Sequence, residues 1–414
     1  MYKHQFKIQP YKHQIKALTK IVRLNFNGAL LMEQGTGKTK VIVDAINILR
    51  NTREIKYVLI ICPISVPGVW ISELEVNMDS NYLIANFVGQ KSIAVEAMLK
   101  YAIKHPSPTL MIAIISYDII RRVPTLSKFP WDVVICDESQ KIKHHTAKRS
   151  KAVHKLSGVP HKFILTGTPI TNSVMDIFSQ WKFLNPDRFG TRWNDFRLRY
   201  GVWGGFHDRK LLGIQNLDDL ISRKEVDSFR VLKSECLDLP EKTFVNVPFE
   251  LDEKVRDIYD QMEENFIAEV EGLDQTKPIR ILAPIILTKI MKLSQIASGF
   301  IKDEDGNAHS LSQTRINITN DLIESILESK NRIVVYTKFI WEFDELLKAL
   351  KKQALVLPVR GKTPSETRTK MFEIFQSNRK RKIVLLSMVS AGALGITLTA
   401  ASNMLFHNIS WSVD

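Results

Sequence analysis

The chain has little cysteine and no long apolar run. Its 414 residues include three cysteines, Cys62, Cys136 and Cys236, and no C-x-x-C pair. An odd, widely spaced set of this kind excludes a disulfide framework and a structural zinc site of the usual spacing, and it indicates a reducing cytosol. No apolar stretch approaches the roughly 20 residues that span a bilayer, and residues 1–5 lack the apolar core of a secretory signal. We therefore expect a cytoplasmic or nucleoid- or nucleus-associated protein that is neither secreted nor membrane-bound.

Acidic residues are outnumbered by basic ones. Lysine and arginine total 58 against 44 aspartates and glutamates, which gives a formal net charge of +14. This balance favours an anionic partner, with nucleic acid first and a membrane surface second. Neither end carries a strongly amphipathic basic helix, which disfavours the membrane. An evenly solvated basic surface is the alternative.

Short apolar runs alternate with helical stretches over residues 1–172 and again over residues 311–414. The expected strands are residues 28–31, 57–62, 109–115, 133–136 and 162–165, and then 332–336, 354–357, 382–386 and 403–406. Such continuous apolar runs are typical of parallel strands that are covered on both faces. The sequence therefore predicts an α/β fold with doubly wound sheets.

Residues 173–310 have a different texture, in which aromatic and charged residues mix. Long helical patterns cover residues 252–271 and 279–297. We interpret this segment as a helical insertion and linker rather than a third sheet, so that the expected domains are 1–172, 173–310 and 311–414.

A glycine loop follows the first predicted strand and precedes a helical run at residues 41–50. Its residues are Gly35, Thr36, Gly37, Lys38 and Thr39. The glycines let backbone N–H groups point at phosphate oxygens, and the following helix adds the positive end of its dipole. Lys38 would then reach the β- and γ-phosphates of a nucleotide, and Thr39 would bind Mg²⁺. Met32 stands where the full motif has glycine, so a simple glycine turn that carries a lysine is the alternative.

Two adjacent carboxylates, Asp137 and Glu138, end the apolar run at residues 133–136. Strand ends line the ligand crevice of a doubly wound sheet. Asp137 could hold Mg²⁺ beside the phosphates, and Glu138 could orient and deprotonate the attacking water. Such a pair is common at strand ends for structural reasons, but the upstream phosphate loop favours the catalytic interpretation.

Together the loop and the acidic pair resemble the nucleotide motifs of superfamily-two helicases. Further segments resemble the Swi/Snf-like branch of DNA-dependent ATPases, in the same order along the chain: Cys62-Pro63 with Trp70 and Glu73, Ser116-Tyr117-Asp118, Lys141-Ile142-Lys143, residues 165–173, residues 334–339 and residues 390–401. The resemblance covers nearly the whole chain. It implies two RecA-like lobes with the helical insertion between them and a nucleotide bound in the cleft.

The resemblance also assigns roles to single residues. Gln14 would read adenine, since an amide can bond its N6 and N7 edge, although such a glutamine is usually just solvated. Gly395 joins the nucleotide-binding set. Thr166 and Thr168 would couple nucleotide state to the nucleic-acid track; the alternative is a helix N-cap.

The resemblance further implies contacts to DNA phosphates from both lobes. The candidates are Pro63, Ser116, Lys338 and Ser390. Arg230 and Lys233 resemble the linker between the lobes, although a plain surface role fits them nearly as well. Phosphate contacts position a protein without reading sequence, so we expect sequence-independent, salt-sensitive binding.

The implied function is an ATP-dependent, Mg²⁺-dependent motor on double-stranded DNA. An RNA helicase fits less well, because Trp70, Glu73 and residues 141–143 match the duplex-DNA branch. The alternative from another class is a catalytically incomplete module that binds ATP and DNA.

The family's sixth motif, whose arginines reach the γ-phosphate, does not follow Trp411, and Asn408 stands where the family often has an acid. The second lobe is therefore expected to be truncated. A longer gene product or a protein partner would supply the remainder; lost catalysis is disfavoured, because Lys38, Asp137 and Glu138 are present.

Overall fold

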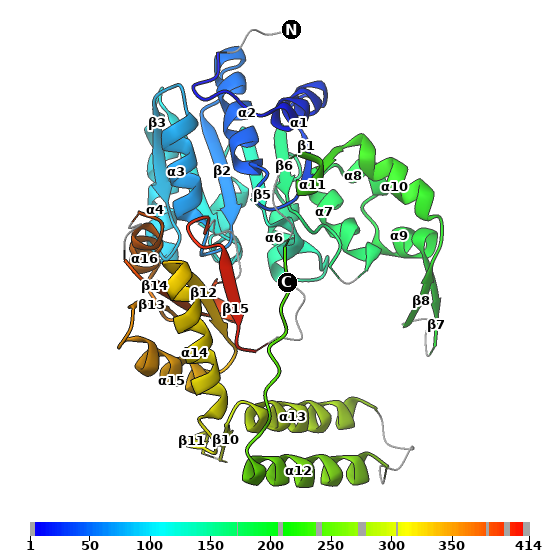
Figure 1. The fold of residues 1–414 in the computed structure, drawn as a ribbon. Coiled ribbons are helices and arrows are strands. Elements are labelled where there is room, and N and C mark those ends of the chain that lie inside the picture. The colour runs from blue at the N-terminus through cyan, green and yellow to red at the C-terminus, as the bar shows by residue number, and fades with distance from the viewer. Residues whose placement is uncertain are drawn as a thin grey trace. The chain divides into compact units, whose positions relative to one another are not determined.

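The computed structural model describes residues 5–171, 173–205, 210–236, 242–271, 279–303, 305–377, 381–392 and 398–408; at residues 265–271, 279–286, 365, 390 and 392 it describes the backbone alone. The chain forms two compact units whose boundary falls near residue 240. Each unit is built on its own parallel sheet (Figure 1). No described helix has the length and apolarity needed to cross a bilayer.

The sheet of the first unit has the strand order β3-β4-β2-β5-β6-β1-β9, and every pairing in it is parallel. The strands are β1 Gly28–Met32, β2 Tyr57–Cys62, β3 Tyr82–Asn86, β4 Leu110–Ser116, β5 Val133–Asp137, β6 His161–Leu165 and β9 Ser228–Val231. The five expected strands are confirmed. The sequence pattern does not predict β3, which is largely exposed, or β9, which is four residues long.

Successive side chains of these strands pack into two different apolar clusters. Leu59 and Ile61 belong to one cluster, and Val58 and Ile60 belong to the other. The second cluster is covered by α1 Lys12–Arg23, α2 Lys38–Thr52 and α3 Pro67–Asn77. The first is covered by α4 Ser92–Lys104, α5 Ile119–Arg122, α6 Lys148–His154, α7 Ile177–Leu184, α9 Trp193–Tyr200 and α10 Leu217–Val226.

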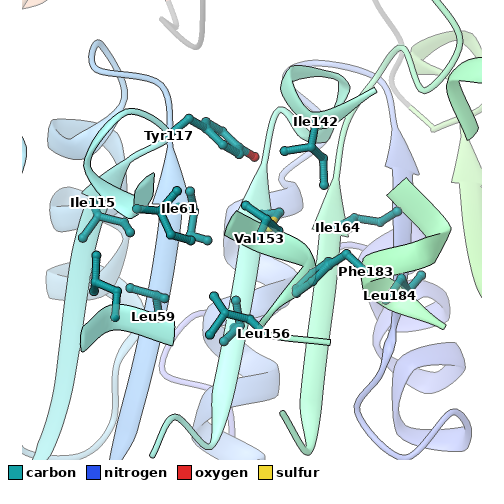
Figure 2. Packing of buried hydrophobic residues seen from close by; sticks show 14 of the residues in the cluster. Leu59, Ile61, Ile115, Tyr117, Ile142, Val153, Leu156, Ile164, Phe183 and Leu184 are labelled. Carbon is teal, nitrogen blue, oxygen red and sulfur yellow. The ribbon is translucent and has the colours of Figure 1, made fainter. Parts of the chain in front are cut away.

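Figure 2 shows part of the first cluster, in which Val153 of α6 and Phe183 of α7 pack against strand side chains. Burial on both faces is the reason that these strands read as continuous apolar runs. The unit is completed by the antiparallel hairpin β7 Gly201–Gly204 and β8 Lys210–Ile214, the helices α8 Pro186–Phe189 and α11 Lys233–Cys236, and the 3₁₀ turns η1 Pro124–Ser127, η2 Ser139–Ile142 and η3 Val174–Asp176.

The second unit has a smaller parallel sheet with the order β13-β14-β12-β15. Its strands are β12 Arg332–Thr337, β13 Leu355–Val359, β14 Ile383–Met388 and β15 Asn403–Phe406, and all four are confirmed predictions. Its helices are α12 Glu253–Glu271, α13 Ile279–Ala297, α14 Thr314–Ser329, α15 Ile340–Leu350, α16 Ser365–Ser377 and α17 Val389–Gly392. The hairpin β10 Phe300–Lys302 and β11 Ala308–Ser310 precedes α14.

Residues 173–310 are thus more varied than a helical insertion. The expected helices at 252–271 and 279–297 are present as α12 and α13, but two hairpins and β9 also fall in this range. Because β9 pairs with β1, part of the range belongs to the first sheet. The division into 1–172, 173–310 and 311–414 stays a prediction.

A buried polar network surrounds Glu342 in the second unit. Glu342 has no exposed surface, and its carboxylate accepts hydrogen bonds from the backbone N–H of Phe339 at 3.1 Å and from the amide of Asn408. The Asn408 amide also donates to the Ser298 hydroxyl at 2.9 Å, and Arg315 donates to the Asn408 oxygen at 2.8 Å. Burial raises the pKa of Glu342. The family resemblance leads one to expect an acid at position 408. The amide of Asn408 instead supplies a hydrogen-bond donor to the buried Glu342 carboxylate.

Asn408→Asp should destabilise the second unit. The change removes the two N–H donors and places a second carboxyl against Glu342, so we expect the free energy of unfolding to fall by about 2–4 kcal/mol. The contact would raise the pKa of the carboxyl pair in the folded state; the loss should therefore shrink as pH falls from 8 to 5, where the folded protein binds the extra proton. Urea unfolding at several pH values measures this. Asn403→Asp, the same change on β15, is the control, and equal losses in the two variants would contradict the expectation.

Candidate functional site

The glycine loop connects β1 to α2, as the sequence predicts. Gly35 and Gly37 have φ angles of 82° and 85°, a left-handed conformation that favours glycine, and Gly37 is the N-cap of α2. A Cβ atom on Gly37 would lie 2.1 Å from Nε2 of Gln14, so a side chain there would have to displace the Gln14 amide. The loop therefore holds the geometry in which backbone N–H groups and a helix N-terminus receive an anion.

Lys38 is folded over its own loop. It is 9% exposed, and its ammonium donates to the carbonyl oxygens of Met32 at 2.9 Å and Glu33 at 3.4 Å. Burial lowers the pKa of Lys38, whereas the nearby Glu138 and Asp137 carboxylates raise it. The negative charges of Asp137 and Glu138 thus stabilise the charged form of Lys38. Thr39 is half-buried in the first turn of α2.

Asp137 is the last residue of β5 and is held on both carboxylate oxygens. Oδ2 accepts from the indole N–H of Trp70 at 2.8 Å, and Oδ1 accepts from the backbone N–H of Glu138 at 2.9 Å. The carbonyl of Asp137 accepts from the Tyr117 hydroxyl at 2.7 Å. Burial, and after it the Glu138 charge, raise the pKa of Asp137 to about 6, while the Trp70 hydrogen bond and the Lys38 charge oppose the rise. The carboxyl is therefore poised close to neutral pH.

Glu138 turns sharply out of the strand, with a φ angle of 50°. Its carboxylate accepts from the Gln140 amide at 2.8 Å, and the oxygen of that amide accepts from the Thr166 hydroxyl at 2.7 Å. Thr166 in turn accepts from the backbone N–H of Thr168 at 2.9 Å. Ser173, rather than either threonine, caps the next helical turn. A hydrogen-bonded chain therefore connects Glu138 to both threonines, and sequence reasoning did not assign Gln140 a part in it.

Gln14 is buried and hydrogen-bonded to the glycine loop. It is 6% exposed, and its amide N–H donates to the carbonyl of Thr36 at 3.2 Å, while its oxygen accepts from the backbone N–H of Tyr11 at 2.9 Å. Nε2 of His13 lies 2.8 Å from the same Thr36 carbonyl. The ring of Tyr11 stacks on His13 at 5.9 Å and is 67% exposed. This start of α1 places an amide and an exposed aromatic face beside the loop.

The predicted site residues of the first unit gather at one edge of its sheet. The glycine loop, Pro63, Ser116, Asp137 and Thr166 follow or end β1, β2, β4, β5 and β6 at their carboxyl ends, where doubly wound sheets bind ligands. Pro63 and Ser116 are buried. Trp70, Tyr117, Gln140 and His13 complete the arrangement. Their signal in the sequence was limited to lying within or beside the quoted motifs.

Two predicted site residues of the second unit come shortly after strands of its sheet. Lys338 follows β12, and its ammonium lies 3.5 Å from the Ser294 hydroxyl and 5.1 Å from the centre of the Phe339 ring. Ser390, for which only the backbone is described, lies in α17, and Gly395 lies outside the described residues. The roles of all three stay predictions.

Comparison with known proteins gives two family matches and several relatives. The SNF2-related domain matches residues 13–299, and the helicase conserved C-terminal domain matches residues 315–414. The chain is 26% identical to the uncharacterized ATP-dependent helicase MG018 of Mycoplasma genitalium, covering 97% of this chain and 37% of that protein. It is 25% identical to the putative ATP-dependent helicase/translocase YwqA of Bacillus subtilis, covering 98% of this chain and 43% of that protein.

A solved structure, the Sulfolobus solfataricus SWI2/SNF2 ATPase core in complex with dsDNA, matches with a TM-score of 0.50 and 24% identity, over 99% of this chain and 84% of that one. This likeness places the chain in the same fold. The chain spans about two fifths of the length of the curated relatives described above.

Proposed function

The chain belongs to the SNF2-related family, and from this premise we propose that it is an ATP-driven motor that moves on or remodels double-stranded DNA. One arrangement carries the proposal: Lys38 of the glycine loop lies in the field of Asp137 and Glu138, and Glu138 is hydrogen-bonded through Gln140 to Thr166. The first part is a phosphate and metal site. The second connects the group that would act on water to the segment that the family resemblance assigns to the nucleic-acid track.

ATP hydrolysis would use these side chains in separate roles. Lys38 would bind the β- and γ-phosphates, and Gln14 would contact the adenine, together with the exposed face of Tyr11. Glu138 would accept a proton from the water whose oxygen attacks the γ-phosphorus, while the bond between that phosphorus and the β–γ bridging oxygen breaks to give ADP and phosphate.

The Thr39 hydroxyl and the Asp137 carboxylate are the groups that would hold Mg²⁺. The described residues contain no cluster of three or more histidine, cysteine or acidic side chains suited to a metal. One carboxylate and one hydroxyl nevertheless fit Mg²⁺, which is usually held by one or two protein oxygens together with substrate phosphates and water. When bound, the ion would neutralise charge that develops on the phosphates.

Duplex DNA is the proposed track, and its phosphates the proposed contacts. Pro63 and Ser116 would contribute from the first unit, and Lys338 and Ser390 from the second. The net charge of +14 supports such a partner. The lobes 1–172 and 311–414, with the segment 173–310 between them, are part of this proposal, as is a location where DNA is held, the nucleoid or the nucleus.

The proposed function is tested by measuring the rate of ATP hydrolysis under three conditions: the protein alone, with duplex DNA, and with duplex RNA of the same sequence. We expect duplex DNA to stimulate turnover well above the level reached with RNA. Stimulation by RNA alone would contradict a DNA motor. Binding of ATP and DNA without turnover under any of these conditions would favour a binding module over a motor.

DNA affinity should fall steeply with salt and depend little on sequence. If about six phosphates are contacted, the association constant should fall by about 10³ between 50 and 200 mM salt, because each neutralised phosphate releases counterions. A gel-shift series on two unrelated duplexes measures both properties. An affinity that is flat in salt, or that differs strongly between the duplexes, would contradict backbone binding.

Trp70→Phe should shift the pH dependence of hydrolysis. The indole hydrogen bond lowers the pKa of Asp137, so its loss should raise that pKa above about 6. As pH falls, the carboxylate form, which would hold Mg²⁺, is then lost at a higher pH than in the wild type. The acid limb of the pH–rate profile should therefore move to higher pH. Trp131→Phe is the matched control, since Trp131 is also a buried indole but donates to the carbonyl of Leu126. An identical shift in both variants would contradict the assignment.

A further inference from the structure

Lys233 lies beside the phosphate loop although it is 198 positions away from Gly35 in the sequence. Strand β9 runs parallel to β1 with Met32 paired to Val231, so the chain that leaves β9 emerges next to the loop that leaves β1. The backbone N–H of Glu33 donates to the carbonyl of Val231 at 3.1 Å, and the backbone N–H of Lys233 donates to the carboxylate of Glu33 at 2.8 Å. Two hydrogen bonds therefore fix the start of α11 against the loop.

The side chain of Lys233 extends over Gly35. A Cβ atom placed on Gly35 would lie 3.3 Å from Cε and 3.6 Å from Nζ of Lys233. The side chain is half-buried, and within the described part of the chain its ammonium makes no hydrogen bond or ion pair. Glu33, the nearest acid along the loop, uses a carboxylate oxygen on the backbone of Lys233 instead.

The two lysines at this loop repel each other. Burial is the main cause that lowers the pKa of Lys38, and the charge of Lys233 lowers it further. The Asp137 and Glu138 carboxylates offset the charge of Lys38, but a further ammonium at the same glycine loop favours the binding of an additional anion there. A nucleotide polyphosphate carries enough charge to neutralise both, and the loop presents its backbone N–H groups to the same ligand.

We infer that Lys233 is a second phosphate-binding lysine of the nucleotide site, and that it contacts the polyphosphate of ATP together with Lys38. This inference rests on the proposed function, because it takes ATP as the ligand. It replaces both sequence interpretations of Lys233, the linker and the plain surface residue. It also gives β9 a function: by pairing with β1, this last strand of the first unit places Lys233 beside the glycine loop.

The test compares ATP and ADP binding by the whole chain with that of Lys233→Gln, Lys233→Arg and Arg230→Gln. Arg230 is the matched control, since it is an exposed cation on β9 three residues away. We expect Lys233→Gln to bind ATP about 10-fold more weakly, the usual consequence of losing one hydrogen bond to a charged group. Lys233→Arg should restore most of the affinity, and Arg230→Gln should lose less than 2-fold.

A thermal readout separates binding from folding. Lys233→Gln should melt at the wild-type temperature without nucleotide, and ATP should raise that temperature by less than in the wild type. Wild-type affinity in Lys233→Gln would overturn the inference, as would an equal loss in Arg230→Gln. If Lys233→Gln melts at a lower temperature than the wild type, Lys233→Met is tested instead, because it keeps the aliphatic part of the side chain over Gly35. Wild-type ATP affinity in Lys233→Met would also overturn the inference.

The two proposals fail in distinguishable ways. If the wild type binds no ATP, or Lys38→Ala binds it as tightly as the wild type, the proposed function fails. If Lys38→Ala loses ATP and Lys233→Gln does not, the nucleotide site stands and only the role of Lys233 fails.

Discussion

Lys38→Ala is expected to weaken ATP binding by about 100-fold or more and to leave no measurable hydrolysis. The side chain is buried, its ammonium lies within 3.4 Å of the carbonyl oxygens of Met32 and Glu33, and the charges of Asp137 and Glu138 stabilise its charged form. Removing it deletes the main cation of the proposed phosphate site and leaves two carboxylates to repel the nucleotide. Preorganised cations that face transferring phosphoryl groups are among the largest contributors to such sites.

The same variant has a second consequence that an unfolded or misfolded protein would not show. The pKa of Asp137 is about 6, raised mainly by burial and held down in part by the charge of Lys38. Without the lysine, that pKa should rise further, so any residual Mg²⁺-dependent binding of ATP should fall off at a higher pH than in the wild type. Calorimetric titration with ATP over a pH series measures both effects. Lys12→Ala, which removes an exposed lysine of α1, is the control. ATP affinity within 2-fold of the wild type in Lys38→Ala would contradict the site.

The parts of the fold that sequence predicts are those that burial on two faces determines. Strands such as β2 and β14 appear as continuous apolar runs because helices cover both sides of each sheet. Strand β3 has only one buried residue, and β9 is too short to show a pattern, so neither gives this signal. Strand β9 is stabilised by its pairing with β1, a contact between residues about 200 positions apart.

The residues of the candidate site likewise fall into those that the sequence predicts and those that it does not. Lys38, Asp137 and Glu138 are recognisable because each follows a strand in a short motif whose spacing is local. The partners of these residues are not local. Trp70 reaches Asp137 across 67 residues and Gln140 reaches Thr166 across 26, so both contacts depend on the order of strands in the sheet. The contacts of Gln14 with Thr36 and of Thr166 with Gln140 likewise arise only in the folded chain, and the roles proposed for these residues stay predictions.

Asn408 shows most clearly that a residue's contacts cannot be predicted from its local sequence. The sequence shows that an amide replaces an acid that the family often has there, but the reason lies 66 residues away, in the fully buried carboxylate of Glu342. A departure from a family pattern can therefore be a local adjustment to a neighbouring charge. It need not indicate a loss of function.

Glu138→Gln is expected to retain ATP binding and to reduce hydrolysis by about 10²–10⁴-fold, the usual contribution of a general base. The substitution preserves the shape of the side chain, and its new amide oxygen can still accept the hydrogen bond from Gln140 that now measures 2.8 Å. What it loses is the ability to take a proton from water. Turnover should therefore fall while the affinity for ATP stays within a few-fold of the wild type.

Gln140→Leu separates this chemical role from the connection to Thr166. It removes the hydrogen-bonded bridge but leaves the Glu138 carboxylate in place, so basal hydrolysis should survive while stimulation by duplex DNA declines. Steady-state hydrolysis with and without DNA, measured beside ATP binding, distinguishes the two variants. If Glu138→Gln hydrolysed ATP at the wild-type rate, the base would have to be another group. If Gln140→Leu kept full DNA stimulation, the signal from the track would have to reach the nucleotide by a route other than Thr166. Because one variant changes the proton acceptor and the other changes only its support, their combined result decides whether the acidic pair is a catalytic centre or a structural end to β5.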